Sequence, residues 1–200
     1  MIDFNTLADR IIDGYELSRE EALELYNAPL EQLKESASKI TSHFFKEAIE
    51  LCCISNGKCG KCSEDCKFCS QSRYYNTEIE KSVLKTVDQF FEEAKYNDKR
   101  GVHRFSIVTA GVRLSKNELK VISEAYKKIT SELKISCCGS LGLLDYDDFV
   151  MLKQSGLKRY HNNLETSPNF FKEICTTHTI KQKEDVIAMA KKAGLEICSG

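Results

Sequence analysis

The chain has 200 residues, 42% of them hydrophobic, and a formal net charge of −1. It contains no apolar run of the ~18 residues that a membrane-spanning helix needs, and its start, MIDFNTLADRIIDG, has no apolar segment of the secretory type. The 30 acidic and 29 basic residues are interleaved, which argues against a nucleic-acid or anionic-membrane surface and predicts a cytoplasmic protein.

Helical patterns dominate the first 47 residues. Ser18 and Glu21 have the spacing of a capping box in front of the helix-forming segment ALELYNA. A longer amphipathic stretch follows, and its aromatic residues Phe44 and Phe45 are expected to pack in a core. We therefore predict an N-terminal helical region over residues 1–47.

After residue 47, short apolar runs alternate with helical patterns. From the second run on, the runs begin at intervals of roughly 25–40 residues, the spacing of βα units, and such alternation produces a parallel sheet covered by helices. The predicted strands are 49–55, 104–111, 133–140, 157–165 and 195–200. The predicted helices are 87–96, 116–128, 146–154, 169–174 and 180–192.

Two βα architectures fit this order. A doubly wound nucleotide-binding fold would carry a G-x-G-x-x-G turn after its first strand, and the sequence has none. A TIM-type (β/α) barrel instead gathers its chemistry at the carboxyl ends of its strands. Polar and sulfur-bearing residues do lie along or at the end of the predicted strands: Ser106, Cys138, Asn163, Glu165 and Cys198. We therefore predict a (β/α) barrel over residues 48–200, incomplete on its C-terminal side, with about five βα units.

The ten cysteines are unusual, because six of them lie between Cys52 and Cys69. Without a secretory signal they are expected to be reduced, so their clustering indicates a metal site or catalysis. Cys62, Cys66 and Cys69 have the spacing C-x3-C-x2-C, which can surround one soft-metal centre. Cys59 would add a fourth thiolate for zinc, although structural zinc sites usually separate two C-x2-C pairs by roughly 15–20 residues. Tight runs are more typical of iron–sulfur ligation.

With Phe68 directly before its last cysteine, this motif resembles the hallmark of the radical S-adenosylmethionine (SAM) superfamily. In that superfamily the three cysteines hold a 4Fe–4S cluster whose open iron binds SAM, and an electron from the cluster cleaves SAM to a 5′-deoxyadenosyl radical. The segments RFSIVTAG, CGSLG, YHNNLETSPNFF and ICSG further resemble the biotin synthase family, over nearly the whole chain.

The resemblance implies roles for individual residues. Cys62, Cys66 and Cys69 would hold the 4Fe–4S cluster, and Phe68 would lie beside it. Asn163 would meet the ureido part of dethiobiotin, and Glu165 would accept hydrogen bonds from the ribose hydroxyls of SAM. Cys138 and Cys198 would hold a second, sulfur-donating iron–sulfur cluster, a 2Fe–2S centre or a variant of it.

This chain departs from the family pattern at two positions. Ser106 stands where the family has a cysteine, and a hydroxyl is a poorer ligand for soft iron than a thiolate. His161 stands where the family has an asparagine. Cys59, on the loop after the first strand, is the alternative third ligand of the second cluster, and the choice between Ser106 and Cys59 stays open. Cys175, inside a helical pattern, is not expected to bind metal.

The function predicted from the resemblance is that of a radical SAM sulfurtransferase, converting dethiobiotin to biotin by inserting sulfur. The alternatives are a maturase-like radical SAM enzyme without sulfur insertion and a zinc-stabilised interaction module. The implied partners are dethiobiotin, an electron donor of the flavodoxin or ferredoxin type, proteins of sulfur delivery and cluster assembly, and a second copy of the chain. No nucleic acid and no membrane is expected among them.

Overall fold

The computed structural model describes residues 3–46 and 48–200. The chain divides into two compact units, Met1–Ile49 and Glu50–Gly200, which are described separately. Within the described residues, none of the helices combines the length and apolar character that crossing a membrane requires.

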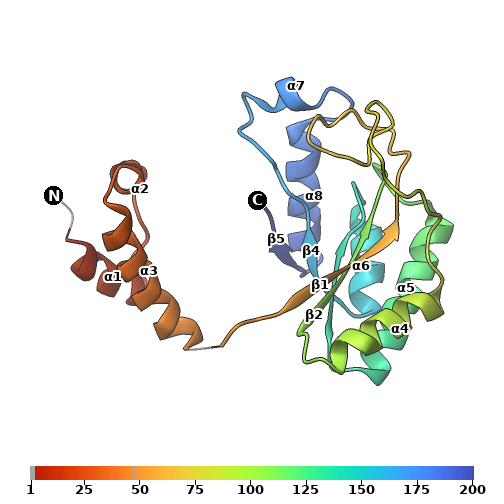
Figure 1. Ribbon diagram of the computed structural model, residues 1–200, viewed down its shortest axis with the longest axis horizontal. Coiled ribbons are helices and arrows are strands. Elements are labelled where there is room, and N and C mark those ends of the chain that lie inside the picture. Colours follow the sequence, from red (N-terminus) through yellow and green to blue (C-terminus); the bar gives the residue numbers. More distant parts are fainter. Residues whose placement is uncertain (1–2, 47) are drawn as a thin grey trace. The chain divides into compact units, whose positions relative to one another are not determined.

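The first unit consists of helices α1 (Phe4–Ile12), α2 (Arg19–Tyr26) and α3 (Leu30–Phe45). Helix α1 packs against α3, and the predicted capping box of Ser18 and Glu21 begins α2. The expectation of core packing for Phe44 and Phe45 is wrong, since they are 56% and 65% exposed. Lys39 of α3 pairs with Asp9 near the end of α1, and α3 continues beyond this contact (Figure 1).

The second unit alternates strands and helices. Its elements are β1 (Cys52–Lys58), α4 (Val87–Asp98), β2 (Arg104–Thr109), α5 (Lys116–Glu132), β3 (Ser136–Ser140), α6 (Tyr146–Gln154), β4 (Leu157–His161), α7 (Phe171–Ile174), α8 (Ile180–Lys192) and β5 (Glu196–Cys198). Capping boxes begin α4, α5, α6 and α8, and all four helices start at the residues predicted from the sequence. The first strand starts three residues later than predicted, where its pairing with β2 begins.

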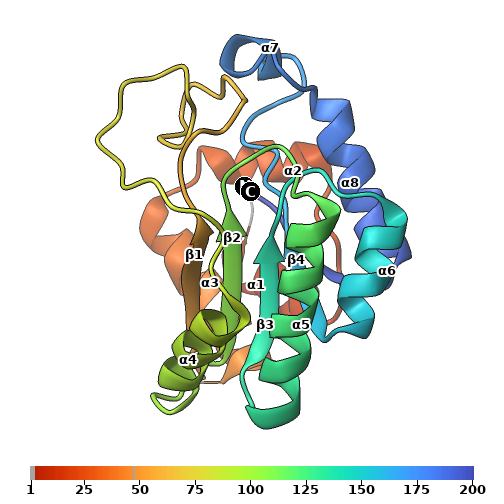
Figure 2. The ribbon, with the colours of Figure 1, turned by 90° about the vertical axis from the view of Figure 1, so that its right-hand side faces the viewer.

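The five strands form one parallel sheet in the order β1-β2-β3-β4-β5. Sequential order with a helix after each of the first four strands is the arrangement of a (β/α) barrel, in agreement with the prediction. Four βα units and a fifth strand make an incomplete barrel. Helices α4, α5, α6 and α8 pack on one face of the sheet (Figure 2). The core lies between that face and the helices, and it includes Phe90, Phe105, Tyr126, Cys137 and Tyr160.

Strand register determines which residues lie level with one another on the other, inner face. One row of register partners crosses the sheet: Ile54, Ser106, Cys138, Arg159 and Glu196. Because side chains alternate along a strand, Cys137 joins the helix-covered core while its neighbour Cys138 turns to the inner face.

Candidate functional site

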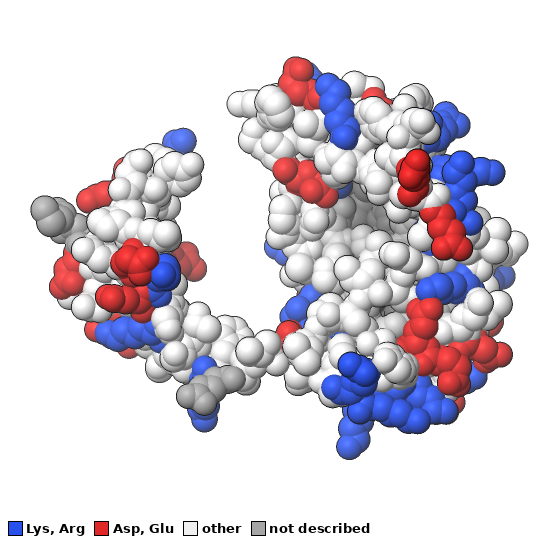
Figure 3. Space-filling model, in the orientation of Figure 1, with Lys and Arg blue, Asp and Glu red and all other residues white. Residues whose placement is uncertain are grey.

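A cavity of about 460 Å³ lies on the inner face of the sheet, toward the carboxyl ends of the strands. On the second unit it opens as a hollow whose walls are mostly uncharged (Figure 3). Nine of the residues singled out from the sequence line it: Cys59, Cys62, Cys66, Phe68, Cys69, Ser106, His161, Asn163 and Glu165. Tertiary folding therefore brings together residues that are about 100 positions apart in the chain.

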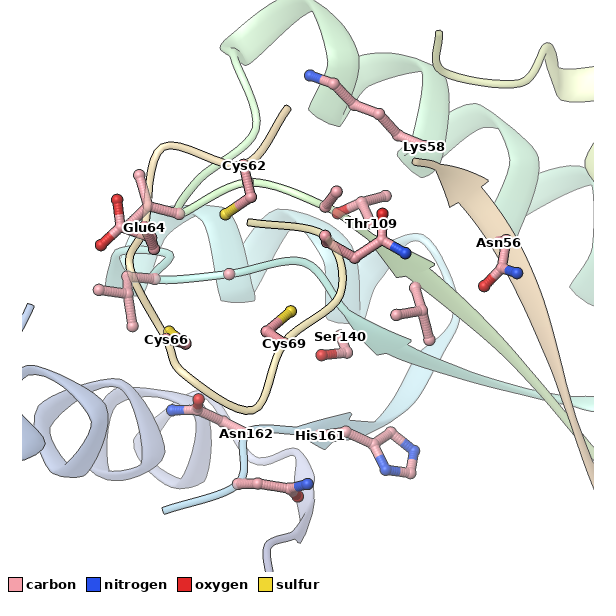
Figure 4. Close-up of a pocket in the computed structure, with 18 of the residues that line it drawn as sticks. Asn56, Lys58, Cys62, Glu64, Cys66, Cys69, Thr109, Ser140, His161 and Asn162 are labelled. Carbon is pink, nitrogen blue, oxygen red and sulfur yellow. The ribbon is translucent and has the colours of Figure 1, made fainter. Parts of the chain in front are cut away.

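The three motif cysteines lie on one curl of the long loop between β1 and α4 (Figure 4). The backbone N–H of Cys62 donates to the carbonyl of Gln71 at 2.9 Å, and that of Cys69 donates to Cys66 at 3.0 Å. The Ser72 hydroxyl donates to the Glu64 carbonyl at 2.6 Å. These bonds hold Cys62, Cys66 and Cys69 half-buried against the cavity, as a soft-metal centre requires.

Cys66 has a neighbour that sequence reasoning did not connect with the motif. Its Sγ lies 3.7 Å from the Sγ of Cys175, which follows α7 and is buried. Burial and the hydrogen bond with Cys175 raise the pKa of the Cys66 thiol to about 12. Three residues after Cys175, His178 completes a C-x2-H spacing, the signal in the sequence that could have linked this segment to metal chemistry.

The motif loop is also tied to the same segment by two carboxylates. Glu64 accepts a hydrogen bond from His178 Nδ1 at 2.8 Å. Burial disfavours the charged carboxylate, but the bonds from His178 and Ser63 prevail and lower the pKa of Glu64 below its usual value. Asp65 accepts hydrogen bonds from the backbone N–H groups that begin the turn at Thr176.

Asn163 and Glu165 lie on the segment that leaves β4. The backbone N–H of Glu165 donates to the carbonyl of Gly200 at 2.9 Å, which joins the exits of β4 and β5. Lys183 of α8 donates from Nζ to the Asn163 carbonyl at 2.7 Å. Glu165 has a φ of 71°, in the left-handed region where residues other than glycine are strained, and such strain is often found at binding sites.

Cys138 and Cys198 are not among the residues that line this cavity and, with Cys52, form a second group of thiols on β1, β3 and β5. Cys138 is buried level with Ser106, next to the guanidinium of Arg104, whereas Cys198 is exposed. Burial raises the pKa of the Cys138 thiol, and the charge of Arg104 opposes that shift. Cys52 adds to the rise in the pKa of the Cys138 thiol. The pKa of Cys52 itself is raised mainly by burial, with a smaller contribution from Cys198.

The structure does not bring Cys59 to this group. Ile54 is the β1 residue level with Ser106 and Cys138, and Cys59 lies five residues further along the chain. At a rise of about 3.3 Å per residue, that places Cys59 roughly 16 Å beyond their level. Cys59 lines the main cavity near the motif instead. Cys52, only two residues before Ile54, is the thiol that register brings near Cys138.

His161 lines the cavity from β4, level with Cys198. Burial, with help from the neighbouring charges of Arg159 and Arg104, lowers the pKa of this imidazole below its usual value. Its Nε2 is buried and has no hydrogen-bond partner among the described residues. A neutral imidazole nitrogen is therefore free to meet a polar group of a ligand at this position.

Comparison with protein-family models matches residues 58–200 to the Radical SAM superfamily. The chain is 43% identical over 194 residues to a biotin synthase from Clostridium perfringens (strain 13 / Type A), covering 97% of this chain and 61% of the relative. It is 44% identical over 200 residues to a biotin synthase from Alkaliphilus metalliredigens, covering 100% of this chain and 63% of the relative. The chain thus spans about three fifths of the length of these curated relatives.

Two solved structures have a similar fold. Methylornithine synthase superposes with a TM-score of 0.81 at 20% identity, covering 97% of this chain and 58% of that chain. The FeFe-hydrogenase maturase from Carboxydothermus hydrogenoformans superposes with a TM-score of 0.79 at 21% identity, covering 99% of this chain and 48% of that chain. Both likenesses support the barrel architecture, and at this identity they show the fold alone.

Proposed function

The chain belongs to the radical SAM superfamily, and on that premise we propose that it cleaves SAM and inserts sulfur into dethiobiotin as a biotin synthase. One observation carries the proposal. The three motif thiols line the same cavity as Asn163 and Glu165, the two polar residues that the family resemblance assigns to dethiobiotin and SAM. The identity of 43% to biotin synthases supports this choice within the superfamily.

The residues present fit a 4Fe–4S cluster. Cys62, Cys66 and Cys69 are three soft ligands on one curl of loop, and three ligands leave one iron of a cubane open. When bound there, the cluster would supply the electron that cleaves the sulfonium of SAM. The protein's part is to hold these thiols in place through the backbone hydrogen bonds of the loop.

The opposite wall of the cavity would position the two organic molecules. The carboxylate of Glu165 accepts hydrogen bonds from vicinal hydroxyls, which suits the ribose of SAM. The side-chain amide of Asn163 can both donate to and accept from a ureido group, which suits dethiobiotin. Apolar residues, including Ile54, Val108 and Phe68, also line the cavity and would surround the apolar part of a bound ligand.

For the second, sulfur-donating cluster we propose Cys138 and Cys198 as ligands, with Cys52 as the third thiolate in place of Cys59. Ser106 lies level with Cys138, but a hydroxyl binds soft iron poorly. Cys52 offers a thiol on the inner face, two residues before the level of Cys138. The partners that this function needs are a flavodoxin- or ferredoxin-type electron donor and proteins that deliver iron and sulfur. On the basis of the family resemblance, we also propose that the protein forms a homodimer and that it is cytoplasmic.

Metal analysis of anaerobically purified protein tests the proposal first. Iron with acid-labile sulfide is expected, and stoichiometric zinc alone would contradict it. After reconstitution, release of deoxyadenosine from SAM should be abolished in Cys62→Ala, Cys66→Ala and Cys69→Ala. The matched control is Cys137→Ala, whose thiol is buried on the helix side of the sheet. Deoxyadenosine formation that never leads to biotin would favour the maturase-like alternative.

A further inference from the structure

The proposed function leaves Cys175 and His178 without a role. They lie on the connection between α7 and α8, and both side chains are almost fully buried, with 3% of Cys175 and 7% of the His178 side chain exposed. A thiol and an imidazole buried together beside another thiol form a group whose chemistry needs an explanation. Cys66, Cys175 and His178 are that group, and their ligand atoms all lie within 4.8 Å of one another.

The spacing of these atoms matches a tetrahedral cation. Zinc, with bonds of about 2.3 Å to sulfur and about 2.0 Å to nitrogen, holds two sulfur ligands roughly 3.8 Å apart and a sulfur and a nitrogen roughly 3.5 Å apart. The two sulfur atoms of Cys66 and Cys175 are 3.7 Å apart. From Cys175 Sγ to His178 the distances are 3.7 Å to Nε2 and 3.3 Å to Nδ1. These distances suit one ion bound by Cys66, Cys175 and His178, and the ligand atoms of the remaining pair, Cys66 and His178, lie within 4.8 Å of each other.

A second observation concerns the orientation of the imidazole. Histidine ligands of metals usually donate their other ring N–H to a carboxylate, which fixes the tautomer and raises the basicity of the ligating nitrogen. Glu64 accepts such a bond from His178 Nδ1 at 2.8 Å, and its side chain is only 10% exposed. With its proton on Nδ1, this imidazole keeps the lone pair of Nε2, which lies 3.7 Å from Cys175 Sγ, for a metal.

We propose that Cys66, Cys175 and His178 bind a divalent cation of the zinc type in the iron-free chain, with Glu64 as the orienting carboxylate. Binding replaces the protons of two thiols, so two protons leave for each ion bound, and water completes the fourth position. The site shares Cys66 with the proposed 4Fe–4S cluster. The cation and the cluster therefore cannot be bound to one chain at the same time. This exclusion rests on the proposed function, whereas binding of the cation does not.

Cobalt(II) titration tests the site, because cobalt bound to thiolates absorbs strongly in the near ultraviolet and visible. The Cys62→Ala/Cys69→Ala double variant removes the motif as a competing site and keeps all three proposed ligands. It should bind one cobalt per chain with a tetrahedral, two-thiolate spectrum. Adding Cys175→Ala or His178→Gln should weaken binding at least tenfold. Absence of cobalt binding by the double variant, or its survival after Cys175→Ala, would overturn the proposal.

Zinc competition in the wild-type chain provides a second measurement and separates the two proposals. Chain preloaded with one equivalent of zinc should take up less iron and sulfide during reconstitution, and Cys175→Ala should relieve this inhibition. If Cys175→Ala takes up iron normally but zinc inhibits it as strongly as it inhibits the wild type, the zinc site is wrong and the cluster site stands. If cobalt binds as expected but neither the wild type nor Cys175→Ala assembles a cluster, the zinc site stands and the proposed cluster site is wrong.

Discussion

The carboxylate of Asp65 accepts hydrogen bonds from the backbone N–H of Thr176 at 2.9 Å and from its side-chain hydroxyl, across 111 residues of sequence. Asp65 directly precedes Cys66, the second motif cysteine. Thr176 lies at the beginning of the connection between α7 and α8. The position of the motif loop over the cavity therefore depends on the connection between α7 and α8, which follows β4 in the chain.

We expect Asp65→Ala to loosen this attachment, because two backbone N–H groups lose their acceptor. The amides of Thr176 and Thr177 should exchange hydrogen faster, and reconstituted protein should lose iron sooner. Glu80→Ala, at an exposed position of the same loop, is the control. Unchanged exchange at both amides would show that other contacts hold the loop.

The same carboxylate predicts a pH dependence. The hydroxyl and backbone N–H of Thr176 lower the pKa of Asp65 below its usual 3.8, so the folded state favours the ionised form. Its stabilising effect is complete above the unfolded-state pKa and is lost as pH falls from that value toward the lower folded-state pKa. Between about pH 5 and pH 2, the stability of Asp65→Ala should therefore fall less steeply than that of the wild type, as urea unfolding at each pH would show.

Measuring the number of iron atoms per chain in single variants tests which residue is the third ligand of the second cluster. Cys52→Ala should lose the iron of that centre while SAM cleavage by the first cluster persists. Cys59→Ala should keep both clusters, because Cys59 lies at another level of the barrel, and Cys53→Ala, next to Cys52 but packed against the helix-side core, is the matched control. Loss of iron in Ser106→Ala but not in Cys52→Ala would assign the position to the serine.

Glu165→Gln should weaken SAM binding without loss of iron. A hydrogen bond to a charged group contributes about 1.5–3 kcal/mol, so the dissociation constant of SAM should rise roughly tenfold or more. Equilibrium binding to the reconstituted protein measures this, with Glu173→Gln on the exposed surface of α7 as the control. An unchanged dissociation constant would remove Glu165 from the SAM site.

Gly142→Ala should destabilise the cavity wall. Gly142 has a φ of 87°, and an added Cβ would lie 2.3 Å from the carbonyl oxygen of Val112. Left-handed strain costs about 1–3 kcal/mol, and the steric overlap adds to it. Gly101→Ala, at a φ of 76° with nothing within 4 Å of the added Cβ, isolates the strain alone. Urea unfolding should therefore show a larger loss for Gly142→Ala, and equal losses would mean that Val112 moves aside.

The sequence by itself determined the local features of this protein. A capping box located the start of α2, and the alternation of apolar runs with helical patterns identified the βα units, because these signals depend on residues within one turn or one strand. The cysteine motif could also be recognised from the sequence, since Cys62, Cys66 and Cys69 lie within eight consecutive residues. Family resemblance, rather than pattern, supplied the roles expected of Asn163 and Glu165.

Only the tertiary structure decided which distant side chains meet. The pairing of β1 with β2 and of β2 with β3 places Cys52 two residues before the level of Cys138 and leaves Cys59 five residues beyond that level. The meeting of Cys66 with Cys175, 109 residues later, depends on how α7 and the motif loop settle at one end of the sheet. Strand register and loop docking arise from hydrogen bonds between segments far apart in the chain. No local pattern of residues encodes them, so the environment of each thiol could be known only after folding.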